Sequence, residues 1–306
     1  MILLLGSTGY VGNVFKKLLV TNSVEWISMS GREFSFANKA ELKSELKSRQ
    51  VSFVVNCAGY TGKPNVDACE WDKGNCLDGN AILPALIREL CEDLGIGWGH
   101  VSSGCIFSGE RPKGGGWKEE DAPNFSFRRP PCSFYSGTKA LGEEVLGWRE
   151  STSNGGWPNW QHESEPTGYV WRLRIPFNEN DGTRNYLSKL QRYENLLQAR
   201  NSLSQLNDFV EACWKCIANE IPYGIYNVTN PGSVRTSDVV DLIIKHGVKI
   251  KDYNFFNSEE EFMRKAAKTP RSNCVLDTTK LQGMGIKLRP VEEALEWSLL
   301  NWKREA

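Results

Sequence analysis

The chain has 306 residues, of which 40% are hydrophobic and 24% are charged, so its composition predicts one or two ordinary globular domains and not a disordered chain. Lysine plus arginine and aspartate plus glutamate each number 37, so no overall field favours nucleic acid or an anionic membrane as a partner. The 9 cysteines favour reduced thiols and a cytoplasmic protein over a disulfide framework. The short apolar start, residues 1–5, predicts neither a signal peptide nor a membrane span.

Strands and helices alternate along the chain. The apolar run Ile2 to Leu5 ends in a glycine and is followed by apolar residues at helical spacing, which predicts a strand, a turn and a helix. Further strands are expected at 25–29, 51–55, 97–107 and 170–175, and further helices at 39–50, at 78–94 and from about 135 onward. Repeated βα units predict an α/β fold, a Rossmann-type doubly wound parallel sheet whose ligands bind beyond the carboxyl ends of the strands.

The last third of the chain predicts a smaller C-terminal substrate domain. Thr236 or Ser237 can cap a helix, Ser258 with Glu261 forms a capping box, and Pro290 starts a final helix. Residues 208–219 and 224–229 can return to the first domain, so we expect interleaved domains. Residues 1–176 with about 205–232 would form the NADPH-binding Rossmann domain, and 177–204 with 233–306 the nucleotide-sugar-binding domain.

A glycine-rich turn, "G-S-T-G-Y-V-G", follows the first strand. Gly6, Gly9 and Gly12 bring backbone amides and the positive end of a helix to the place where a dinucleotide pyrophosphate would lie. The spacing G-x-x-G-x-x-G differs from the commoner G-x-G-x-x-G, and a tight structural turn is the alternative. The pattern indicates a dinucleotide site.

The residues after the second strand indicate which dinucleotide binds. An NAD-binding fold has an acidic residue there, about 20 residues after the glycines, whereas this chain has Ser30, Gly31 and Arg32. An arginine can pair with a 2′-phosphate, so the sequence favours NADPH over NADH. The alternative is that Arg32 is an ordinary surface charge.

A tyrosine and a lysine stand four residues apart in "F-Y-S-G-T-K-A". Tyr135 and Lys139 would share one helix face, where the ammonium lowers the pKa of the phenol and lets it exchange a proton with a substrate carbonyl. The alternative is that the tyrosine packs in the core and the lysine reaches water. Small residues in "N-C-A-G-Y-T-G" at 56–62 and the strand-end residues Ser103 and Cys105 add the remaining parts of a carbonyl-reducing site.

Together these motifs resemble an extended short-chain dehydrogenase/reductase. The segments "T-G-K-P-N-V-D-A-C-E", "S-G-C-I-F", "K-E-E-D-A-P-N-F", "I-Y-N-V-T-N-P-G" and "P-R-S-N-C-V-L-D-T-T-K-L" more closely resemble the bifunctional nucleotide-rhamnose synthase/epimerase-reductases, which are related to dTDP-4-dehydrorhamnose reductase. The resemblance spans residues 6 to 281.

The resemblance implies roles for individual residues. Tyr135 would be the acid, Lys139 its partner, and Ser103 the active-site hydroxyl. Cys105 and Lys189 would be the two acid–base groups of epimerisation, with Cys105 placed two residues beyond Ser103 on an extended strand. The alternatives are a small buried cysteine and an exposed helix lysine. The cofactor contacts would be Gly6, Thr8, Gly9, Tyr10, Val11, Arg32, Ala58, Gly59, Thr61, Tyr135 and Lys139, and the substrate contacts Lys63, Asn185, Arg271 and Asn273.

Some of these positions differ from the family or have a simpler interpretation. Lys63 stands where plant members have arginine, so a bidentate contact would be lost. Arg271 is a candidate diphosphate ligand, with a surface arginine as the alternative. Segment 109–121 is a candidate lid. Segments 128–132 and 151–168 depart from the family pattern, and their composition is typical of solvated loops, with lids, partner contacts or species-specific decoration as open alternatives.

The function expected is NADPH-dependent 3,5-epimerisation and 4-keto reduction of a nucleotide-linked 4-keto-6-deoxyglucose, with UDP as the expected nucleotide. The alternatives are a 4-ketosugar reductase without epimerase activity, a GDP-fucose-synthase-like enzyme, and a non-catalytic scaffold like the regulatory subunit of methionine adenosyltransferase. We expect no metal site, since Cys213 and Cys216 form a C-x-x-C without a second pair at zinc spacing. A homodimer is a candidate assembly, and we expect no nucleic-acid or membrane partner.

Overall fold

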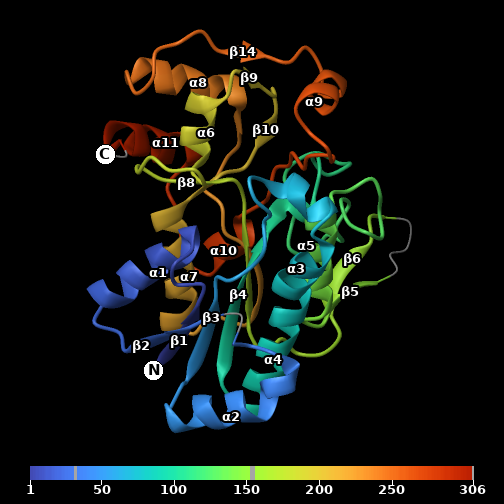
Figure 1. Cartoon of the computed structure of the whole chain (residues 1–306), viewed down its shortest axis with the longest axis vertical. Coiled ribbons are helices and arrows are strands. Elements are labelled where there is room, and N and C mark those ends of the chain that lie inside the picture. The colour runs from blue at the N-terminus through green and yellow to red at the C-terminus, as the bar shows by residue number, and fades with distance from the viewer. Residues whose placement is uncertain (31–32, 152–155, 305–306) are drawn as a thin grey trace.

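A six-stranded parallel sheet forms the centre of the protein. The computed structural model describes residues 1–30, 33–151 and 156–304, and its sheet has the strand order β12-β7-β4-β3-β1-β2 (Figure 1). The strands are β1 (Ile2–Leu5), β2 (Trp26–Met29), β3 (Phe53–Asn56), β4 (Gly97–Ser103), β7 (Tyr169–Leu173) and β12 (Gly224–Asn227). The predicted Rossmann-type sheet is confirmed, as is the return of the predicted segment 224–229 to it as β12, which pairs with β7.

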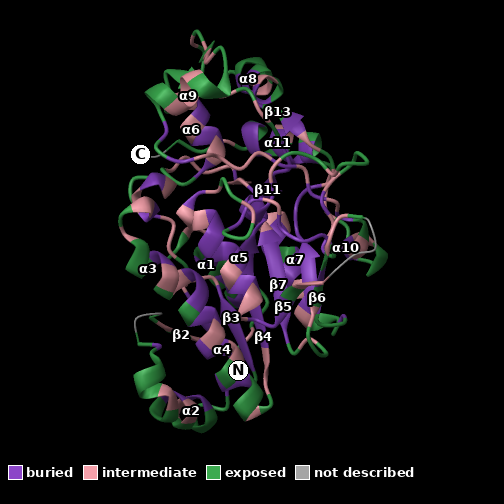
Figure 2. Cartoon of the chain, turned by 90° about the vertical axis from the view of Figure 1, so that its right-hand side faces the viewer, coloured by how far each residue is buried: buried purple, intermediate pink, exposed green. Residues whose placement is uncertain are grey.

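Helices cover both faces of the sheet. They are α1 (Tyr10–Thr21), α2 (Lys39–Ser48), α3 (Lys73–Leu77), α4 (Leu83–Leu94), α5 (Phe134–Glu144), α7 (Leu206–Ala218) and α10 (Thr279–Gly283). The side chains of β1 show the two faces, because Ile2 and Leu4 join the core under α1 and α7 while Leu3 and Leu5 join the core under α2 and α4. Burial on both faces explains why these strands are apolar runs without alternation, and Figure 2 shows them as the buried centre of the molecule.

A crevice is expected where the strand order reverses. The chain adds β2 on one side of β1 and then crosses to add β3 on the other side. In such sheets the loops after the two flanking strands diverge, and ligands bind at the carboxyl ends of these strands. The switch point of this protein therefore lies between the loops that follow β1 and β3.

A smaller lobe lies above the carboxyl edge of the sheet in Figure 1. Its core is formed by apolar residues of its helices, of its short strands and of the segments between them. Its elements are β8 (Pro176–Phe177), α6 (Tyr186–Arg192), β9 (Asn195–Leu196), β10 (Arg200–Asn201), β11 (Ser204–Gln205), β13 (Val234–Arg235), α8 (Thr236–Lys245), β14 (Asn254–Phe255), α9 (Glu259–Lys265) and α11 (Val291–Leu300). The predicted domain boundaries stay a prediction.

The helix expected at 78–94 is confirmed, and its first turn, Asp78–Ile82, is π-helical. Two other expectations about local structure were wrong. The strand expected at 97–107 ends at Ser103 and is followed by a 3₁₀ turn, Gly104–Ile106. The expected solvated loop 151–168 contains part of a hairpin, β5 (Trp148–Ser151) with β6 (Asn159–His162), whose Trp160 is buried and donates to the Glu143 carboxylate at 3.1 Å.

The second half of the candidate lid at 109–121 is packed in place. Trp117 is 1% exposed, stacks on Phe107 with ring centroids 5.2 Å apart, and pairs with Leu276 in a short bridge. Glu119 is also buried and accepts the Asn227 backbone amide at 2.8 Å. The part from Trp117 onward therefore belongs to the fold, and the prediction of a lid stays open only for the largely exposed residues 109–116.

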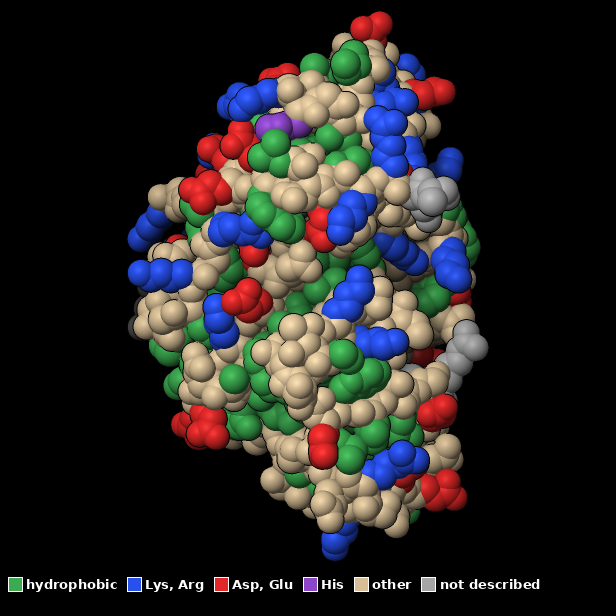
Figure 3. Space-filling view, turned by 90° about the vertical axis from the view of Figure 1, so that its left-hand side faces the viewer, with side chains coloured by type: hydrophobic (Ala, Val, Ile, Leu, Met, Phe, Trp, Pro, Cys, Tyr) green, Lys and Arg blue, Asp and Glu red, His purple; other side chains and the backbone are tan. Residues whose placement is uncertain are grey.

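None of the helices in the described part of the chain is long and apolar enough to cross a membrane. Figure 3 shows lysine and arginine side chains interspersed with aspartate and glutamate on one face of the molecule, in keeping with the zero formal net charge.

Candidate active site

The glycine turn, which is the loop after β1, forms one side of the switch point. Gly6 has a φ of +74°, and a Cβ there would lie 2.7 Å from the amide nitrogen of Ala58, so the loops after β1 and β3 touch. A Cβ on Gly12 would lie 2.0 Å from the Gly6 carbonyl oxygen. Helix α1 starts after Gly9 without a side-chain cap and with no acidic residue in its first turn. Its first amides therefore suit an anionic ligand such as a pyrophosphate.

The residues that follow the glycine turn reach toward the smaller lobe. The Tyr10 hydroxyl donates to Asn178 Oδ1 at 3.2 Å, and burial followed by the charge of Glu179 raises the pKa of Tyr10. Val11 packs against the core under α1, and Thr8 is exposed at the turn. Tyr10 thus fastens the turn to the segment after β8. Arg32 lies outside the described residues.

Tyr135, Lys139 and Ser103 come together at the carboxyl end of β4. Helix α5 begins after Ser133, whose hydroxyl accepts the Ser136 amide at 3.1 Å, and this cap fixes the helix start that presents Tyr135. Ser103 is the last residue of β4, and its hydroxyl interacts with the Tyr135 phenol. The predicted trio of carbonyl-reducing groups is therefore assembled in one place.

Lys139 points toward the loop after β3. Its Nζ lies 3.5 Å from the Val101 carbonyl oxygen, and a Cβ on Gly59 would lie 3.4 Å from Nζ and 3.2 Å from Asn80 Oδ1. Asn80 in turn holds the loop by accepting the Tyr60 amide at 3.0 Å. Gly59 therefore brings the backbone of this loop close to the ammonium, where a side chain would be crowded.

The pKa of Tyr135 is shifted in the opposite direction to the sequence-based expectation. Burial raises the pKa of Tyr135 well above its ordinary value, Cys105 adds to the rise, and the Ser103 hydroxyl acts against it. Burial also lowers the pKa of Lys139. Desolvation disfavours the charged form of both groups. This effect is larger than the mutual stabilisation expected from two groups one helix turn apart. In this structure Tyr135 keeps its proton, as a proton donor must.

Cys105 reaches the site by a different route from the one expected. It lies in the 3₁₀ turn after β4, where its amide donates to Ser103 Oγ at 3.2 Å. Burial raises the pKa of the Cys105 thiol, while Ser103, Ser136 and the more distant cations Arg174 and Lys139 act to lower it. The turn therefore keeps Cys105 beside Ser103 although the extended-strand argument was wrong.

Lys189 lies on α6 of the smaller lobe and is partly buried. Burial lowers its pKa, and the positive charge of Arg184 lowers it further. Arg184 itself donates to Thr61 Oγ1 at 2.6 Å, which joins the segment before α6 to the loop after β3. Lys189 is thus linked to the cofactor edge of the site through Arg184.

The side chain of Asn185 is already occupied within the protein. Its Oδ1 accepts the Leu187 amide at 3.0 Å as the cap of α6, and its Nδ2 donates to the Asn178 and Asn180 carbonyls at 2.8 and 2.7 Å. Asn185 is fully buried. The structure gives this residue the task of holding α6 in place, so the expected side-chain contact with a substrate is not available without breaking these bonds.

Arg271 is engaged in a bidentate ion pair with Asp67, at 2.6 and 2.9 Å. Burial raises the pKa of Asp67, but the Arg271 guanidinium more than offsets this, so the pKa is lowered overall. Asn273 accepts from Asn201 Nδ2 at 3.2 Å, and Lys63 is exposed in the loop before Asp67. The interpretation of Arg271 as an isolated surface arginine does not fit, since it joins the late segment to the loop after β3.

Comparisons with known proteins agree with this arrangement. Residues 1–152 match the model of the RmlD substrate binding domain family. The chain is 30% identical to a bifunctional dTDP-4-dehydrorhamnose 3,5-epimerase/dTDP-4-dehydrorhamnose reductase of Arabidopsis thaliana. The matched region of 298 residues covers 96% of this chain and 90% of the relative. The chain belongs to this epimerase-reductase family. The predicted family is thereby confirmed.

A further relative resembles the chain in sequence, and two solved structures resemble it in fold. The chain is 28% identical to a trifunctional UDP-glucose 4,6-dehydratase/UDP-4-keto-6-deoxy-D-glucose 3,5-epimerase/UDP-4-keto-L-rhamnose-reductase of Arabidopsis thaliana, but spans only 40% of its length. The crystal structure of the L780 UDP-rhamnose synthase from Acanthamoeba polyphaga mimivirus has a TM-score of 0.83 at 20% identity and covers 98% of both chains. A dTDP-4-dehydrorhamnose reductase from Bacillus anthracis in complex with NADP has a TM-score of 0.74 at 19% identity, over 97% of this chain and 96% of that one.

Sequence reasoning missed four residues of the candidate site. Arg174 directly follows β7. A charged residue at the end of a largely apolar strand could have been predicted from the sequence to face the site. Asp67 stands inside the quoted motif "T-G-K-P-N-V-D-A-C-E" and Arg184 directly precedes Asn185, but neither was singled out. Asn80 had no usable signal, because only the π-helical turn brings its amide to the loop after β3.

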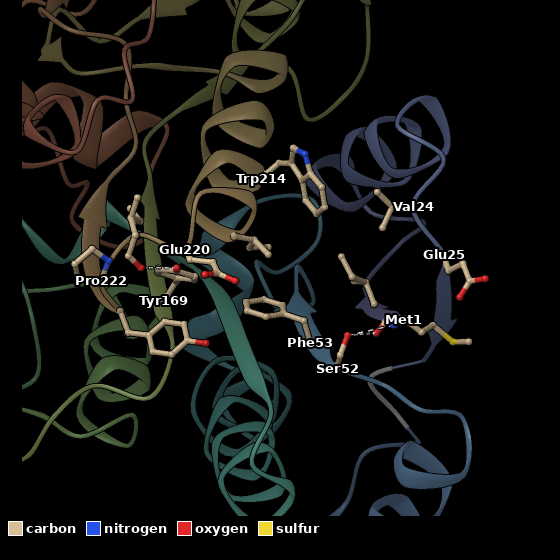
Figure 4. A pocket seen from close by; sticks show the side chains of 13 residues that line it. Met1, Val24, Glu25, Ser52, Phe53, Tyr169, Trp214, Glu220 and Pro222 are labelled. Atoms are coloured by element: carbon tan, nitrogen blue, oxygen red, sulfur yellow. Dashed lines mark hydrogen bonds between the residues drawn. The ribbon is translucent and has the colours of Figure 1, made fainter.

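A separate cavity lies at the opposite edge of the sheet (Figure 4). It has a volume of about 760 Å³ and is lined by the first residues of strands, among them Ile2, Phe53 and Tyr169, together with Trp214 and Tyr223. Because ligands of parallel sheets bind at the carboxyl ends of the strands, this cavity is not the candidate active site.

Proposed function

We propose that the protein is an NADPH-dependent enzyme that inverts C3 and C5 of a UDP-linked 4-keto-6-deoxyglucose and then reduces the ketone at C4, giving UDP-L-rhamnose. The observation that carries the proposal is the assembly of Tyr135, Lys139, Ser103 and Cys105 at one strand end, beside a glycine turn suited to a dinucleotide. Membership of the epimerase-reductase family supports the reaction type.

In the reduction, the protein supplies a proton and a hydrogen bond. Bound NADPH, held by the glycine turn and lying along the Gly59 backbone, would supply the hydride to C4. Tyr135 then donates its proton to the developing oxyanion, and Ser103 donates a hydrogen bond to the same oxygen. Lys139, with its ammonium beside Gly59, favours the phenolate that Tyr135 becomes.

In the epimerisation, the C4 ketone makes the neighbouring C–H bonds acidic, because the carbanion is delocalised onto the ketone oxygen. The roles that we propose agree with the pKa directions, since burial lowers the pKa of Lys189 and raises that of Cys105. Lys189 as the free amine takes the proton from carbon, and the Cys105 thiol returns a proton to the opposite face. Ser103 and Tyr135 stabilise the enolate oxygen between the two steps, and exchange with water restores both groups.

Solvent deuterium incorporation tests the epimerisation. In D₂O the wild-type product should carry deuterium at C3 and C5, and this label should be lost in Cys105→Ser and in Lys189→Ala. Both variants should still reduce a substrate that was epimerised beforehand, which serves as the control for folding and cofactor binding. Unlabelled product with the gluco configuration would leave a plain 4-ketosugar reductase.

The identity of the nucleotide is tested by assaying one sample with the UDP, dTDP and GDP forms of the 4-ketosugar. UDP should give the highest kcat/KM. A preference for GDP would favour the fucose-synthase-like alternative. Fluorescence titration that shows NADPH binding but no turnover with any substrate would favour the scaffold.

The proposed preference for NADPH rests on Arg32. Glu33, the next residue in the sequence, accepts the Ser30 backbone amide at 3.1 Å with its carboxylate. A charge-assisted contact to the 2′-phosphate is worth roughly 1.5–3 kcal/mol, or about tenfold to a hundredfold in affinity. Arg32→Ala should lose this preference, and Arg49→Ala, at an exposed arginine paired with Glu45, is the matched control. Equal kcat/KM for NADPH and NADH in the wild type would remove the argument.

A further inference from the structure

Arg174 is a buried cation at the carboxyl edge of the sheet, directly after β7. It is 6% exposed, and Ser204 holds its peptide on both sides: the Arg174 amide donates to Ser204 Oγ at 3.1 Å, and the Ser204 amide donates to the Arg174 carbonyl at 2.8 Å. The next residue, Ile175, has a φ of +36°, a left-handed backbone that is strained for a β-branched side chain. Such strain persists only where the surroundings over-determine the backbone, so the place of Arg174 is tightly set.

The Arg174 guanidinium has no carboxylate partner in the part of the chain that the structure describes. Its Nη2 donates to Asn201 Oδ1 at 2.6 Å and to the Ser272 carbonyl, and its Nε is buried without a hydrogen-bond partner. By contrast, the nearby Arg172 is fully buried in a pair with Glu143 at 2.7 Å. A buried guanidinium with only neutral partners is costly unless a negative charge develops beside it.

Arg174 packs against the turn that carries Cys105. A Cβ on Gly104 would lie 3.5 Å from Arg174 Cδ, and Gly104 is the residue before Cys105. The Cys274 thiol donates to the Gly104 carbonyl at 3.2 Å, and the Cys274 amide donates at 3.0 Å to the same Asn201 oxygen that accepts from Arg174. The guanidinium and the turn are therefore parts of one packed unit.

The titratable groups around the Cys105 thiol come from several elements. They are Tyr135 and Lys139 on α5, Cys132 before α5, Arg174 after β7, and Cys274 in the late segment that packs against the turn. Arg174 and Lys139 are the cations of this set. Both lower the pKa of Cys105 against the larger effect of burial, which raises it.

We propose that Arg174 is a positioning residue for epimerisation, which stabilises the Cys105 thiolate formed when the thiol gives its proton to the substrate carbon. This inference rests on the proposed epimerase function. In the step, the S–H bond of Cys105 breaks, a C–H bond forms at C3 or C5, and the electron pair of the broken bond stays on sulfur, where the positive charge of Arg174 stabilises it. Lys139 lies beside Gly59, where the cofactor is expected. We therefore assign the stabilisation of the Cys105 thiolate to Arg174.

The Cys105 thiolate can be titrated without substrate or cofactor. The ultraviolet thiolate absorbance is measured against pH for each protein and for the same protein carrying Cys105→Ser. The difference between the two curves is the titration of Cys105. Arg174→Met removes the charge, so the titration midpoint should rise by about one pH unit or more. Arg174→Lys restores a charge and should bring the midpoint back toward that of the wild type. An unchanged midpoint in Arg174→Met overturns the proposal.

Two controls separate this effect from a folding defect. Arg200→Met makes the same change at an exposed arginine that donates to Ser233 Oγ at 2.8 Å, and its titration should match the wild type. If Arg174→Met does not fold, Arg174→Gln replaces it, because the amide keeps a donor for Asn201 while losing the charge. A midpoint of Arg174→Gln equal to that of the wild type also overturns the proposal.

Deuterium uptake keeps this test separate from the test of function. Wild-type protein that incorporates no deuterium at C3 and C5 refutes the proposed epimerisation and the role of Arg174 with it. Deuterium uptake in the wild type together with an unchanged midpoint in Arg174→Met refutes the role of Arg174 alone. Slower uptake in Arg174→Met, recovered in Arg174→Lys along with the midpoint, is the expected result.

Discussion

Replacing Tyr135 with phenylalanine removes one oxygen from the site and keeps the ring that packs beside Cys105. The lost interaction is the one with Ser103, whose hydroxyl still accepts the Cys105 amide at 3.2 Å. One such hydrogen bond is worth about 0.5–1.5 kcal/mol, so the free energy of unfolding should fall by about 1 kcal/mol. Loss of the proton donor should slow reduction by about 10²–10⁴, which is about 3–5 kcal/mol in activation free energy. The effect on catalysis should therefore clearly exceed the effect on stability.

Three measurements on Tyr135→Phe decide this. NADPH consumption with the 4-ketosugar gives the rate, denaturant unfolding gives the stability, and fluorescence titration gives the affinity for NADPH, which should stay near that of the wild type. Tyr226→Phe is the matched control, because it loses a hydroxyl that donates to the Pro222 carbonyl at 2.7 Å in the sheet, away from the site. Reduction by Tyr135→Phe at a rate near that of the wild type would refute its role as the proton donor.

Three further outcomes are expected. Gly59→Ala should weaken NADPH binding in a fluorescence titration, because the new methyl group lies beside Lys139 where the cofactor is expected. Gly74→Ala, with open space around it, is the control and should bind NADPH as the wild type does. Equal affinities of the two variants would contradict the proposed cofactor path. Glu143→Gln should lower the free energy of unfolding by about 3–5 kcal/mol in urea, because it leaves a fully buried guanidinium without its carboxylate, and a loss below about 1 kcal/mol would contradict this. The rate of deuterium exchange should rise with pH as Lys189 loses its proton, and Arg184→Gln should move this rise to higher pH, because Arg184 lowers the pKa of Lys189; an unmoved profile would argue against Lys189 as the base.

Local pattern was sufficient for much of the fold and for part of the site. The apolar runs and their helical neighbours predicted the parallel sheet, because strands buried on both faces and amphipathic helices each leave a periodic signature. The turn that starts at Gly6 and the pair Tyr135 and Lys139 were recognisable for the same reason, since each depends on residues close together in the sequence. Their place at the carboxyl edge of the sheet then follows from the fold class.

Contacts between distant segments were decided by the tertiary structure. The hairpin around Trp160 was missed because its polar residues follow the pattern of a loop, while the stabilising contact is with Glu143 on α5. Arg271 could be a ligand or a surface charge until the fold placed Asp67 beside it, 204 residues away in sequence. The pKa directions of Tyr135 and Lys139 also required the structure, because spacing shows which charges are near but not how much water is excluded. Desolvation depends on everything that packs around a group, and those neighbours come from the whole chain.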